Sequence, residues 1–468
     1  MEEYDLIVIG SGAGMNIVDV AVNAGQRVAL IENGPLGGTC LNRGCIPSKM
    51  WIYPADVIRE IGDAAKIGVS ARVESVDFDL IRRRTWDLVL GDRAHMEEAV
   101  KEDPRLRFYP TTARFVGEHV IQVYESTITA PNIVISAGAR TYVPPIPGLA
   151  DVPYLTSETI FDLTKLPKSI ILIGGGYKSC EFAHFFSALG VEVSIIQRNV
   201  RLVPEEEPEI SFVVGKKLGE HVRISTNQTA VEVRKGADGY TVTRSDGESG
   251  KFEEERAEML FIGTGAQSNA DLLNVQAAGV KTDMAGFIEV NEFLETNVAG
   301  IWALGDITGR HMFRHTANYE SQVVWYNMVN PIKVSTDEHA IPHAIYTYPT
   351  VGSVGMTEAQ AKVNGLKYLI GVNRYANVAK GSAMGDDHGL VKVVVEKGTR
   401  RILGAHIVGK EADLLVQQIV YLMNAGDQGY MPMARSQVIH PALSEVLIGA
   451  FGRLVDPETM GAEHEHHH

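Results

Sequence analysis

The sequence predicts an α/β protein with two doubly wound, Rossmann-like nucleotide-binding domains and a separate C-terminal α+β domain. An apolar strand, a glycine turn, a helix and a second strand follow one another twice, beginning at Leu6 and again at Ser169. From about residue 340 the pattern changes to strand-like runs followed by helices. A chain of 468 residues is too long for one ordinary core, so roughly two to four domains are expected.

The first unit begins with an apolar strand over residues 6–9 and a turn that contains three glycines: Gly10, Gly12 and Gly14. We expect a helix over residues 17–24 and a strand over residues 27–32 that ends in Glu32. Met15 takes the place of the usual third glycine, which implies a slightly different fit between helix and strand. A strand, turn, helix and strand in this order are typical of a nucleotide site.

The second unit repeats this order, with a strand over residues 169–173, a helix over residues 180–189 and a strand over residues 192–197. Its turn holds Gly174, Gly175 and Gly176. A later strand of each unit returns to a glycine, Gly138 in the first and Gly265 in the second, where the backbone must pass close to a bound dinucleotide.

The remaining segments complete the predicted order. A helical region extends from residue 50 to about residue 100, and the proline-rich residues 143–148 form a stiff linker. Strands over residues 390–395 and 402–408 precede two helices, over 413–425 and 442–451.

Two cysteines, Cys40 and Cys45, lie four residues apart in a glycine-rich segment. Such a pair can close a small strained loop at a helix start, where the helix N-terminus lowers the pKa of the inner thiol. Buried structural thiols or half of a zinc site are the alternatives. A zinc site needs two more soft ligands, and only Cys180 remains, inside a predicted nucleotide-binding helix. The pattern therefore favours a redox pair.

His440 is followed five residues later by Glu445, across the start of a predicted helix. A carboxylate in this position fixes the tautomer of the imidazole, and the histidine then exchanges a proton with a thiol. Taken alone, such a pair is more often a satisfied surface or core histidine. Together with Cys40 and Cys45 it indicates an acid–base residue.

Composition excludes several classes of function. The net charge of −15 argues against a nucleic-acid or anionic-membrane surface. No stretch reaches the ~18 apolar residues of a membrane span, and the first residues lack the pattern of a signal peptide. Three cysteines are too few for a secreted disulfide framework, so we expect a reducing cytoplasm.

These motifs resemble the FAD-dependent pyridine nucleotide–disulfide oxidoreductases (class I), which include glutathione reductase, dihydrolipoamide dehydrogenase and mycothione reductase. The likeness runs from Tyr4 to about Leu454 and includes the cysteine motif, both glycine turns, residues 302–306 and the final His–Glu pair. Residues 181–184, 268–273 and 439–443 are most similar to mycothione reductase.

The resemblance implies a domain for each part of the chain. These are an FAD-binding domain over residues 1–150 and 271–340, an NAD(P)-binding domain over 151–270, a C-terminal dimerisation domain over 341–455 and a tail over 456–468 that is in part similar to a purification tag. A homodimer is implied in the same way.

The resemblance also implies roles for single residues. FAD would be held by Gly10, Gly12, Gly14, Glu32, Gly38, Thr39, Gly138, Asp306, Thr316 and Ala317. The nicotinamide dinucleotide would contact Gly174, Gly176, Tyr177, Arg198 and Gly265. Lys49 and Glu181 would pair beside the flavin. Cys45 would lie against the flavin as a thiolate, and Cys40 would exchange with the substrate. His440 would reach Cys40 from the partner subunit.

Several positions leave alternatives open. The second strand ends at Gln197 instead of an acid and is followed by Arg198, which favours NADPH over NADH. Tyr177 is either a gate over the flavin or a packing residue. Lys178 replaces a usual apolar residue and either meets a phosphate or faces solvent. Arg43 either places a cation near the substrate or packs on the surface.

The sequence therefore predicts an NAD(P)H-dependent flavoenzyme that reduces a small disulfide, with mycothione reductase as the most similar activity. Dihydrolipoamide dehydrogenase, which uses NAD and a lipoyl group, is the alternative. A nucleotide-binding protein with an idle cysteine pair is a third possibility, which the complete set of catalytic residues argues against.

Overall fold

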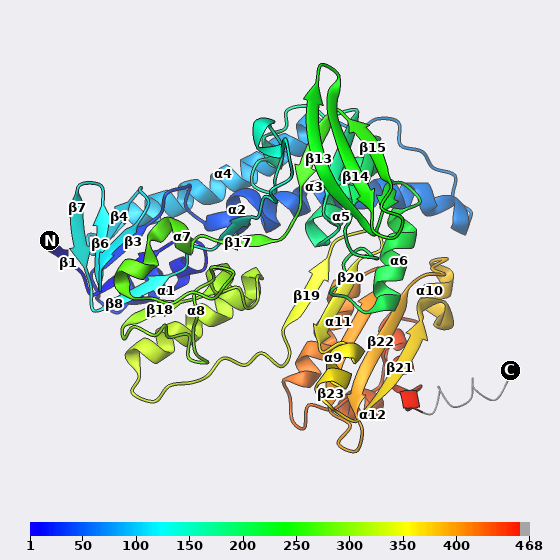
Figure 1. Cartoon of the computed structure of the whole chain (residues 1–468). Coiled ribbons are helices and arrows are strands. Elements are labelled where there is room, and N and C mark those ends of the chain that lie inside the picture. Colours follow the sequence, from blue (N-terminus) through cyan, green and yellow to red (C-terminus); the bar gives the residue numbers. More distant parts are fainter. Residues whose placement is uncertain (459–468) are drawn as a thin grey trace.

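The structure, a computed structural model, describes residues 1–458, so most of the predicted tail lies outside the described residues. Three sheet-containing regions follow one another in space: the first parallel sheet, the second parallel sheet with an antiparallel extension, and the C-terminal sheet (Figure 1). This arrangement confirms the predicted fold class. Within residues 1–458, no helix is both long and apolar enough to cross a membrane.

The first sheet is entirely parallel and surrounds the first glycine turn. Its strands, in spatial order, are β18 (Ile301–Ala303), β8 (Asn132–Ile135), β2 (Leu6–Ile9), β3 (Val28–Ile31) and β4 (Leu106–Tyr109). A parallel strand that is buried on both faces has an unbroken run of apolar residues, and the sequences of β2 and β3 have this pattern. Helix α1 (Gly14–Asn23) begins directly at the end of the turn.

Gly14 explains how α1 packs closely without the usual third glycine. A Cβ at Gly14 would lie 2.3 Å from Ser136 Oγ and 2.8 Å from Val8 Cγ1. Met15, which holds the expected glycine position, is buried in the core instead. The close contact between helix and sheet is therefore made one residue earlier than in the usual motif.

The predicted helical region is interrupted. It consists of α2 (Gly38–Arg43), α3 (Cys45–Asp63), the 3-10 turn η1 (Ala64–Ile67) and the long helix α4 (Phe78–Glu102). Gly68 ends η1 with a φ of +83°, a left-handed conformation that glycine adopts without strain, and residues 69–77 form no helix. A small sheet then follows: β1 (Glu2–Glu3), β7 (Ser126–Thr129), β6 (Val120–Val123) and β5 (Arg114–Gly117).

The second nucleotide unit is also built on a parallel sheet. Its strands are β12 (Arg223–Ser225), β11 (Glu192–Ile196), β10 (Ser169–Ile173) and β16 (Met259–Ile262). Its helices are α5 (Tyr177–Ala188) and α6 (Pro208–Leu218). An antiparallel extension adds β13 (Gln228–Gly236), β14 (Gly239–Asp246) and β15 (Phe252–Ala257). Helix α5 begins at Tyr177, three residues before the predicted start, because it starts directly after the glycine turn.

The chain then returns to the first sheet. Strands β9 (Ala139–Thr141) and β17 (Ala266–Ser268) pair with each other where the chain leaves the first domain and returns to it. Helix α7 (Ala270–Leu273) and the 3-10 turn η5 (Gly305–Thr308) then precede helix α8 (Arg314–Val329).

The C-terminal sheet is antiparallel. Its strands are β19 (Pro342–Ile345), β20 (Val351–Gly355), β23 (Ile402–Val408), β22 (Leu390–Glu396) and β21 (Tyr368–Arg374). The accompanying helices are α9 (Glu358–Val363), α10 (Ala379–Ala383), α11 (Ala412–Met423), α12 (Met431–Arg435) and α13 (Glu445–Phe451). Helix α13 begins at Glu445, later than the predicted residue 442, because the segment after Pro441 forms turns first.

A buried ion cluster joins this sheet to the second nucleotide unit. Lys392 is 1% exposed and lies 3.0 Å from Glu207, the residue before α6, and 3.0 Å from Glu209 in the first turn of α6. Glu358 of α9 lies 2.7 Å from the same ammonium group. Their carboxylates raise the pKa of Lys392 against the opposing effect of burial.

Candidate active site

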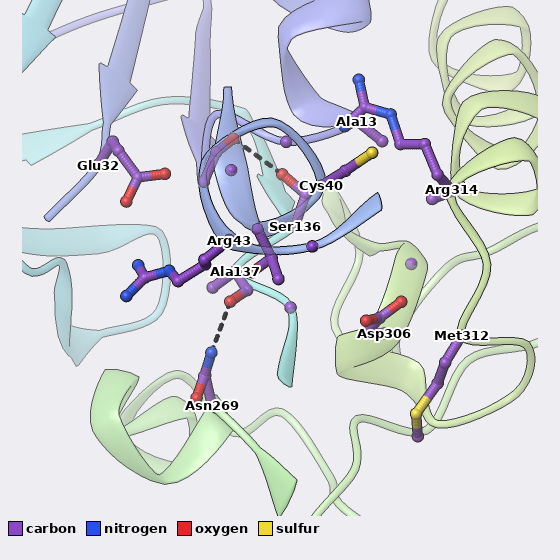
Figure 2. Close-up of a pocket in the computed structure, with 18 of the residues that line it drawn as sticks. Ala13, Glu32, Cys40, Arg43, Ser136, Ala137, Asn269, Asp306, Met312 and Arg314 are labelled. Atoms are coloured by element: carbon purple, nitrogen blue, oxygen red, sulfur yellow. Dashed lines mark hydrogen bonds between the residues drawn. The ribbon is translucent and has the colours of Figure 1, made fainter. Parts of the chain in front are cut away.

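A cavity of about 310 Å³ lies where the first glycine turn, α2, α3 and the N-termini of α5 and α8 come together. Figure 2 shows part of its lining, with Glu32, Cys40 and Arg314 among the labelled residues. Sequence-predicted residues from every one of these elements line it. They are Gly10, Gly12, Glu32, Gly38, Thr39, Cys40, Cys45, Lys49, Gly138, Tyr177, Glu181, Asp306 and Ala317. The remaining predicted residues lie elsewhere and are described below.

The first glycine turn and the start of α2 lie very close to each other. Gly38 has a φ of +66°, and a Cβ on it would lie 2.7 Å from the Cα of Gly12. At the end of β3, the carboxylate of Glu32 accepts hydrogen bonds from Ser11 N at 2.9 Å, Ser11 Oγ at 2.8 Å and Gly34 N at 2.8 Å. The turn, the helix N-terminus and the fixed acid suit the pyrophosphate and ribose of a dinucleotide.

Two further predicted FAD contacts are Asp306 and Thr316. Burial raises the pKa of Asp306, while the nearby ammonium of Lys178 acts in the opposite direction. Thr316 does not line the cavity, but its buried Oγ1 has no hydrogen-bond partner among residues 1–458. Thr316 therefore stays a predicted contact, and the fit to FAD rests on the glycine turn, Glu32 and Asp306. The residues present therefore fit FAD.

The cysteine pair lies at the junction of α2 and α3. Cys40 is in α2, and Cys45 is the first residue of α3; both are free thiols. A hydrogen bond from the Cys40 thiol lowers the pKa of Cys45 to about 7, and the ammonium of Lys49 acts in the same direction. Donating that hydrogen bond, together with burial, raises the pKa of Cys40. These shifts favour the thiolate on Cys45 over the thiolate on Cys40.

Lys49 and Glu181 form the predicted pair, with Lys49 Nζ 2.8 Å from Glu181 Oε2. The backbone N–H of Tyr346 donates to the other oxygen of Glu181 at 2.9 Å, and the Lys49 ammonium lies 4.3 Å from the Tyr346 ring centroid. Glu181 is 6% exposed, so its charge is buried and compensated from two sides. Tyr346 was not predicted, because no local motif marks a residue of the C-terminal domain that packs here.

Hydrogen bonds from Asn42 and Arg93 hold the segment that leads into α2 and Cys40. The amide of Asn42 donates to the carbonyl of Leu36 at 2.8 Å and of Gly38 at 2.9 Å. Arg93 of α4 in turn donates to Asn42 Oδ1, through Nη2 at 2.6 Å and Nε at 3.1 Å. Neither residue was predicted, although the cysteine motif contains Asn42. The long helix α4 thereby fixes the position of α2.

Within one chain, His440 does not line this cavity. Its side chain is 72% exposed, and Nδ1 lies 2.8 Å from Glu445 Oε1. Because a carboxylate only accepts, Nδ1 carries the proton and Nε2 is free to take another. The hydrogen bond from His440 lowers the pKa of Glu445, which also accepts from the Ala442 N–H at 2.9 Å.

The second glycine turn lies outside the cavity. Gly174 has a φ of +101°, Gly176 precedes α5, and Gly265 has a φ of +50°. Gln197 is buried, and its Oε1 accepts from the backbone N–H of Gly175 at 3.3 Å. Arg198 is exposed after β11.

Arg201, a second arginine after β11, makes a hydrogen bond within its own segment. It donates to the carbonyl of Pro204 at 3.0 Å.

Three basic side chains complete the cavity lining. Arg43 lies near Gly34 and the Glu32 carboxylate, so it faces the cavity instead of packing on the outer surface. Lys178 also faces the cavity, with Nζ 3.5 Å from Ser157 Oγ. Arg314, at the start of α8, was not predicted. The available signal was its position directly before the segment 315–317, which the resemblance places at the flavin.

Comparison with known proteins agrees with this geometry. Residues 4–321 match the family model of the pyridine nucleotide-disulphide oxidoreductases, and residues 341–450 match the dimerisation domain of the same group. The chain is 35% identical to mycothione reductase of Mycobacterium tuberculosis, over 96% of this chain and 99% of that protein. It is 33% identical to dihydrolipoyl dehydrogenase of Rhizobium etli, over 97% and 99%.

A solved structure has the same architecture. The HOCl-induced flavoprotein disulfide reductase RclA from Escherichia coli matches with a TM-score of 0.84 and 28% identity, over 96% of this chain and 99% of that chain. The family models together cover most of the chain, and the curated relatives cover nearly all of it. The chain therefore belongs to the pyridine nucleotide-disulphide oxidoreductase family and is a flavoprotein disulfide oxidoreductase.

Proposed function

We propose that this enzyme passes electrons from NADPH, by way of FAD, to a small disulfide through Cys40 and Cys45, in the manner of mycothione reductase. The observation that supports this most directly is the thiol pair itself. It lies in the wall of a dinucleotide-shaped cavity, and its two members have pKa values shifted in opposite directions. Two thiols with different pKa values suit thiol–disulfide exchange. The thiol with the lower pKa holds the negative charge in the reduced pair, and the other thiol reacts with the substrate disulfide once its proton has been removed.

FAD would be held by the glycine turn, Glu32 and Asp306, with Lys49 and Glu181 beside its reactive ring. When bound, FAD supplies the two-electron link between the nicotinamide and the disulfide. The protein holds the anionic charge on Cys45 through the N-terminus of α3 and the Lys49 ammonium.

His440 of the partner subunit would exchange the proton of Cys40. Its Glu445 partner fixes the Nδ1–H tautomer and leaves Nε2 free. The exposure of His440 in one chain and the match to a dimerisation domain support a homodimer in which each active site uses both subunits. We place the enzyme in the cytoplasm, where the reducing environment suits a thiol pair that turns over.

We infer a preference for NADPH from the end of β11. Gln197 provides no carboxylate that would repel a 2′-phosphate, and its side chain is turned back onto Gly175. Arg198 is exposed next to it and would meet that phosphate, while Tyr177, 42% exposed and facing the cavity, would act as the gate over the flavin. The change Arg198→Ala is expected to raise KM for NADPH much more than for NADH. Equal losses for both would contradict the assignment.

The substrate is tested by comparing two reactions of the purified FAD-loaded enzyme under anaerobic conditions. We expect NADPH-dependent reduction of mycothione or another small disulfide. We expect little reduction of NAD⁺ or NADP⁺ by dihydrolipoamide. Fast reduction of NAD⁺ by dihydrolipoamide would instead identify a dihydrolipoamide dehydrogenase. The parallel Cys45→Ser variant should bind FAD and lose disulfide turnover.

A further inference from the structure

Arg314 is a basic residue at the positive end of a helix, beside the cysteine pair. It is the first residue of α8, and it lines the cavity together with Cys40. Figure 2 shows the Cys40 sulfur directed toward the side of the cavity from which Arg314 extends. Within residues 1–458, no carboxylate lies within ion-pair distance of its guanidinium group.

This placement is unfavourable unless something negative lies nearby. A cation in the first turn of a helix is repelled by the positive end of the helix dipole. The first turn of α8 contains no acidic residue that would offset it. Two anions are available in principle: the thiolate of Cys40 and the phosphates of a dinucleotide on the glycine turn, since a Cβ on Gly12 would lie 3.7 Å from Arg314 Nη1.

Cys40 is the thiol of the pair with the raised pKa, so its ionisation requires a stabilising charge. The hydrogen bond that it donates to Cys45 and its burial both raise its pKa, and the charge of Arg314 acts against them. The charged groups Lys49 and Glu181 act on Cys45 instead. Arg314 is therefore the cation of this cavity that faces the attacking sulfur.

We propose that Arg314 is a positioning residue for thiol–disulfide exchange and that its guanidinium group stabilises the thiolate of Cys40. This inference rests on the proposed function. The Cys40 proton leaves to His440 of the partner subunit, and the Cys40 thiolate bonds to one substrate sulfur while the substrate S–S bond breaks. The second substrate sulfur departs as a thiolate. The Cys45 thiolate then attacks the Cys40 sulfur, which re-forms the Cys40–Cys45 disulfide and releases the other substrate thiolate. The two electrons come from the reduced pair.

The test measures the pKa of Cys40 directly. In FAD-loaded Cys45→Ser protein, Cys40 is the only thiol of the pair, and Cys180 is fully buried. The rate of alkylation of Cys40 by iodoacetamide, followed by mass spectrometry across pH, reports its ionisation. Adding Arg314→Met should raise the apparent pKa by about one unit and slow alkylation about tenfold below both pKa values. Arg314→Lys should retain most of the rate.

The matched control is Lys178→Met in the same background. It removes another cation from the same cavity, but one that acts on Asp306, so the pKa of Cys40 should not change. An unchanged pKa of Cys40 in both Arg314→Met and Arg314→Gln would overturn the proposal. If these variants then also lost FAD, Arg314 would serve the phosphates instead. The substrate assays use the unmodified enzyme, so the two proposals fail separately. If no disulfide is reduced but Arg314→Met still raises the pKa of Cys40, the proposed function is refuted and the link between Arg314 and Cys40 stands.

Discussion

Glu320 provides a direct test of the electrostatics beneath the cavity. This residue of α8 is 2% exposed, and its Oε2 accepts a hydrogen bond from the backbone N–H of Gly305 at 2.6 Å. It thereby supports the turn that presents Asp306 to the cavity. Burial raises the pKa of Glu320 to about 7, from an ordinary value of 4.5.

The sign of the pH effect follows from this shift. Below about pH 4.5 the carboxyl group is protonated in both the folded and the unfolded protein and adds no pH dependence. Between about pH 4.5 and 7 the folded protein retains a proton that the unfolded chain releases, so the free energy of unfolding falls as pH rises. Above about pH 7 the loss is complete and amounts to about 3 kcal/mol.

Glu320→Gln keeps an oxygen for the Gly305 N–H but carries no charge. We expect it to become more stable than the unmodified enzyme as pH rises, by up to about 3 kcal/mol above pH 7, and to show no advantage below about pH 4.5. Urea unfolding of the FAD-loaded protein at several pH values measures this difference. Glu254→Gln, which removes an acid from the exposed part of β15, should leave the pH profile parallel to that of the unmodified enzyme. A constant difference between Glu320→Gln and the unmodified enzyme across pH would refute the reasoning.

Three further predictions follow from the geometry of the ion pairs. Lys49→Met removes a cation that lowers the pKa of Cys45, so the pKa of Cys45 should rise by about one unit. A titration of the ultraviolet absorbance of the thiolate measures this change, and no rise would exclude Lys49 as a cause of the lowered pKa. His440→Gln should slow disulfide reduction by about 10²–10⁴-fold with an unchanged flavin spectrum, and normal rates would remove His440 from the mechanism. Lys392→Met leaves the buried carboxylate of Glu207 without its partner, so urea unfolding should show a loss of about 3–5 kcal/mol, and a neutral result would show that Glu207 is protonated or solvated instead.

The elements with the strongest apolar patterns could be predicted to the residue. Strands β10 and β23 begin and end where the sequence places them, because a buried strand is an unbroken apolar run between turn residues. Helix starts were less accurate. Periodicity marks the buried face of a helix but not its first turn, and the first turns of α5 and α13 depend on a glycine turn and a proline-containing segment.

The cavity could be predicted only in part, for a related reason. Cys45 was singled out because its spacing from Cys40 is a local property of the sequence, and Lys49 was placed beside the flavin only by the resemblance that the same contiguous motif carries. Arg314 comes to line the cavity through the approach of distant elements, which no local pattern reports. Arg43 lies inside the cysteine motif, but the sequence left open whether it faces the cavity or the outer surface. Lys178 was noticed only as a departure from an apolar position, and the direction of its side chain needed the fold.

The different environments of the two cysteines follow from the break at Gly44. A Cβ on Gly44 would lie 2.8 Å from the carbonyl oxygen of Thr39, so a larger residue could not join α2 and α3 this closely. The break makes Cys45 the first residue of α3, where the helix N-terminus favours a thiolate, and it places Lys49 one turn further along the same face. Cys40 remains inside the short helix α2, and the hydrogen bond that it donates to Cys45, together with burial, raises its pKa. The spacing of the motif therefore does more than bring two sulfurs together. It gives only one of them an environment that stabilises its charge. In the proposed mechanism, the other exchanges with substrate once His440 of the partner subunit and Arg314 assist it.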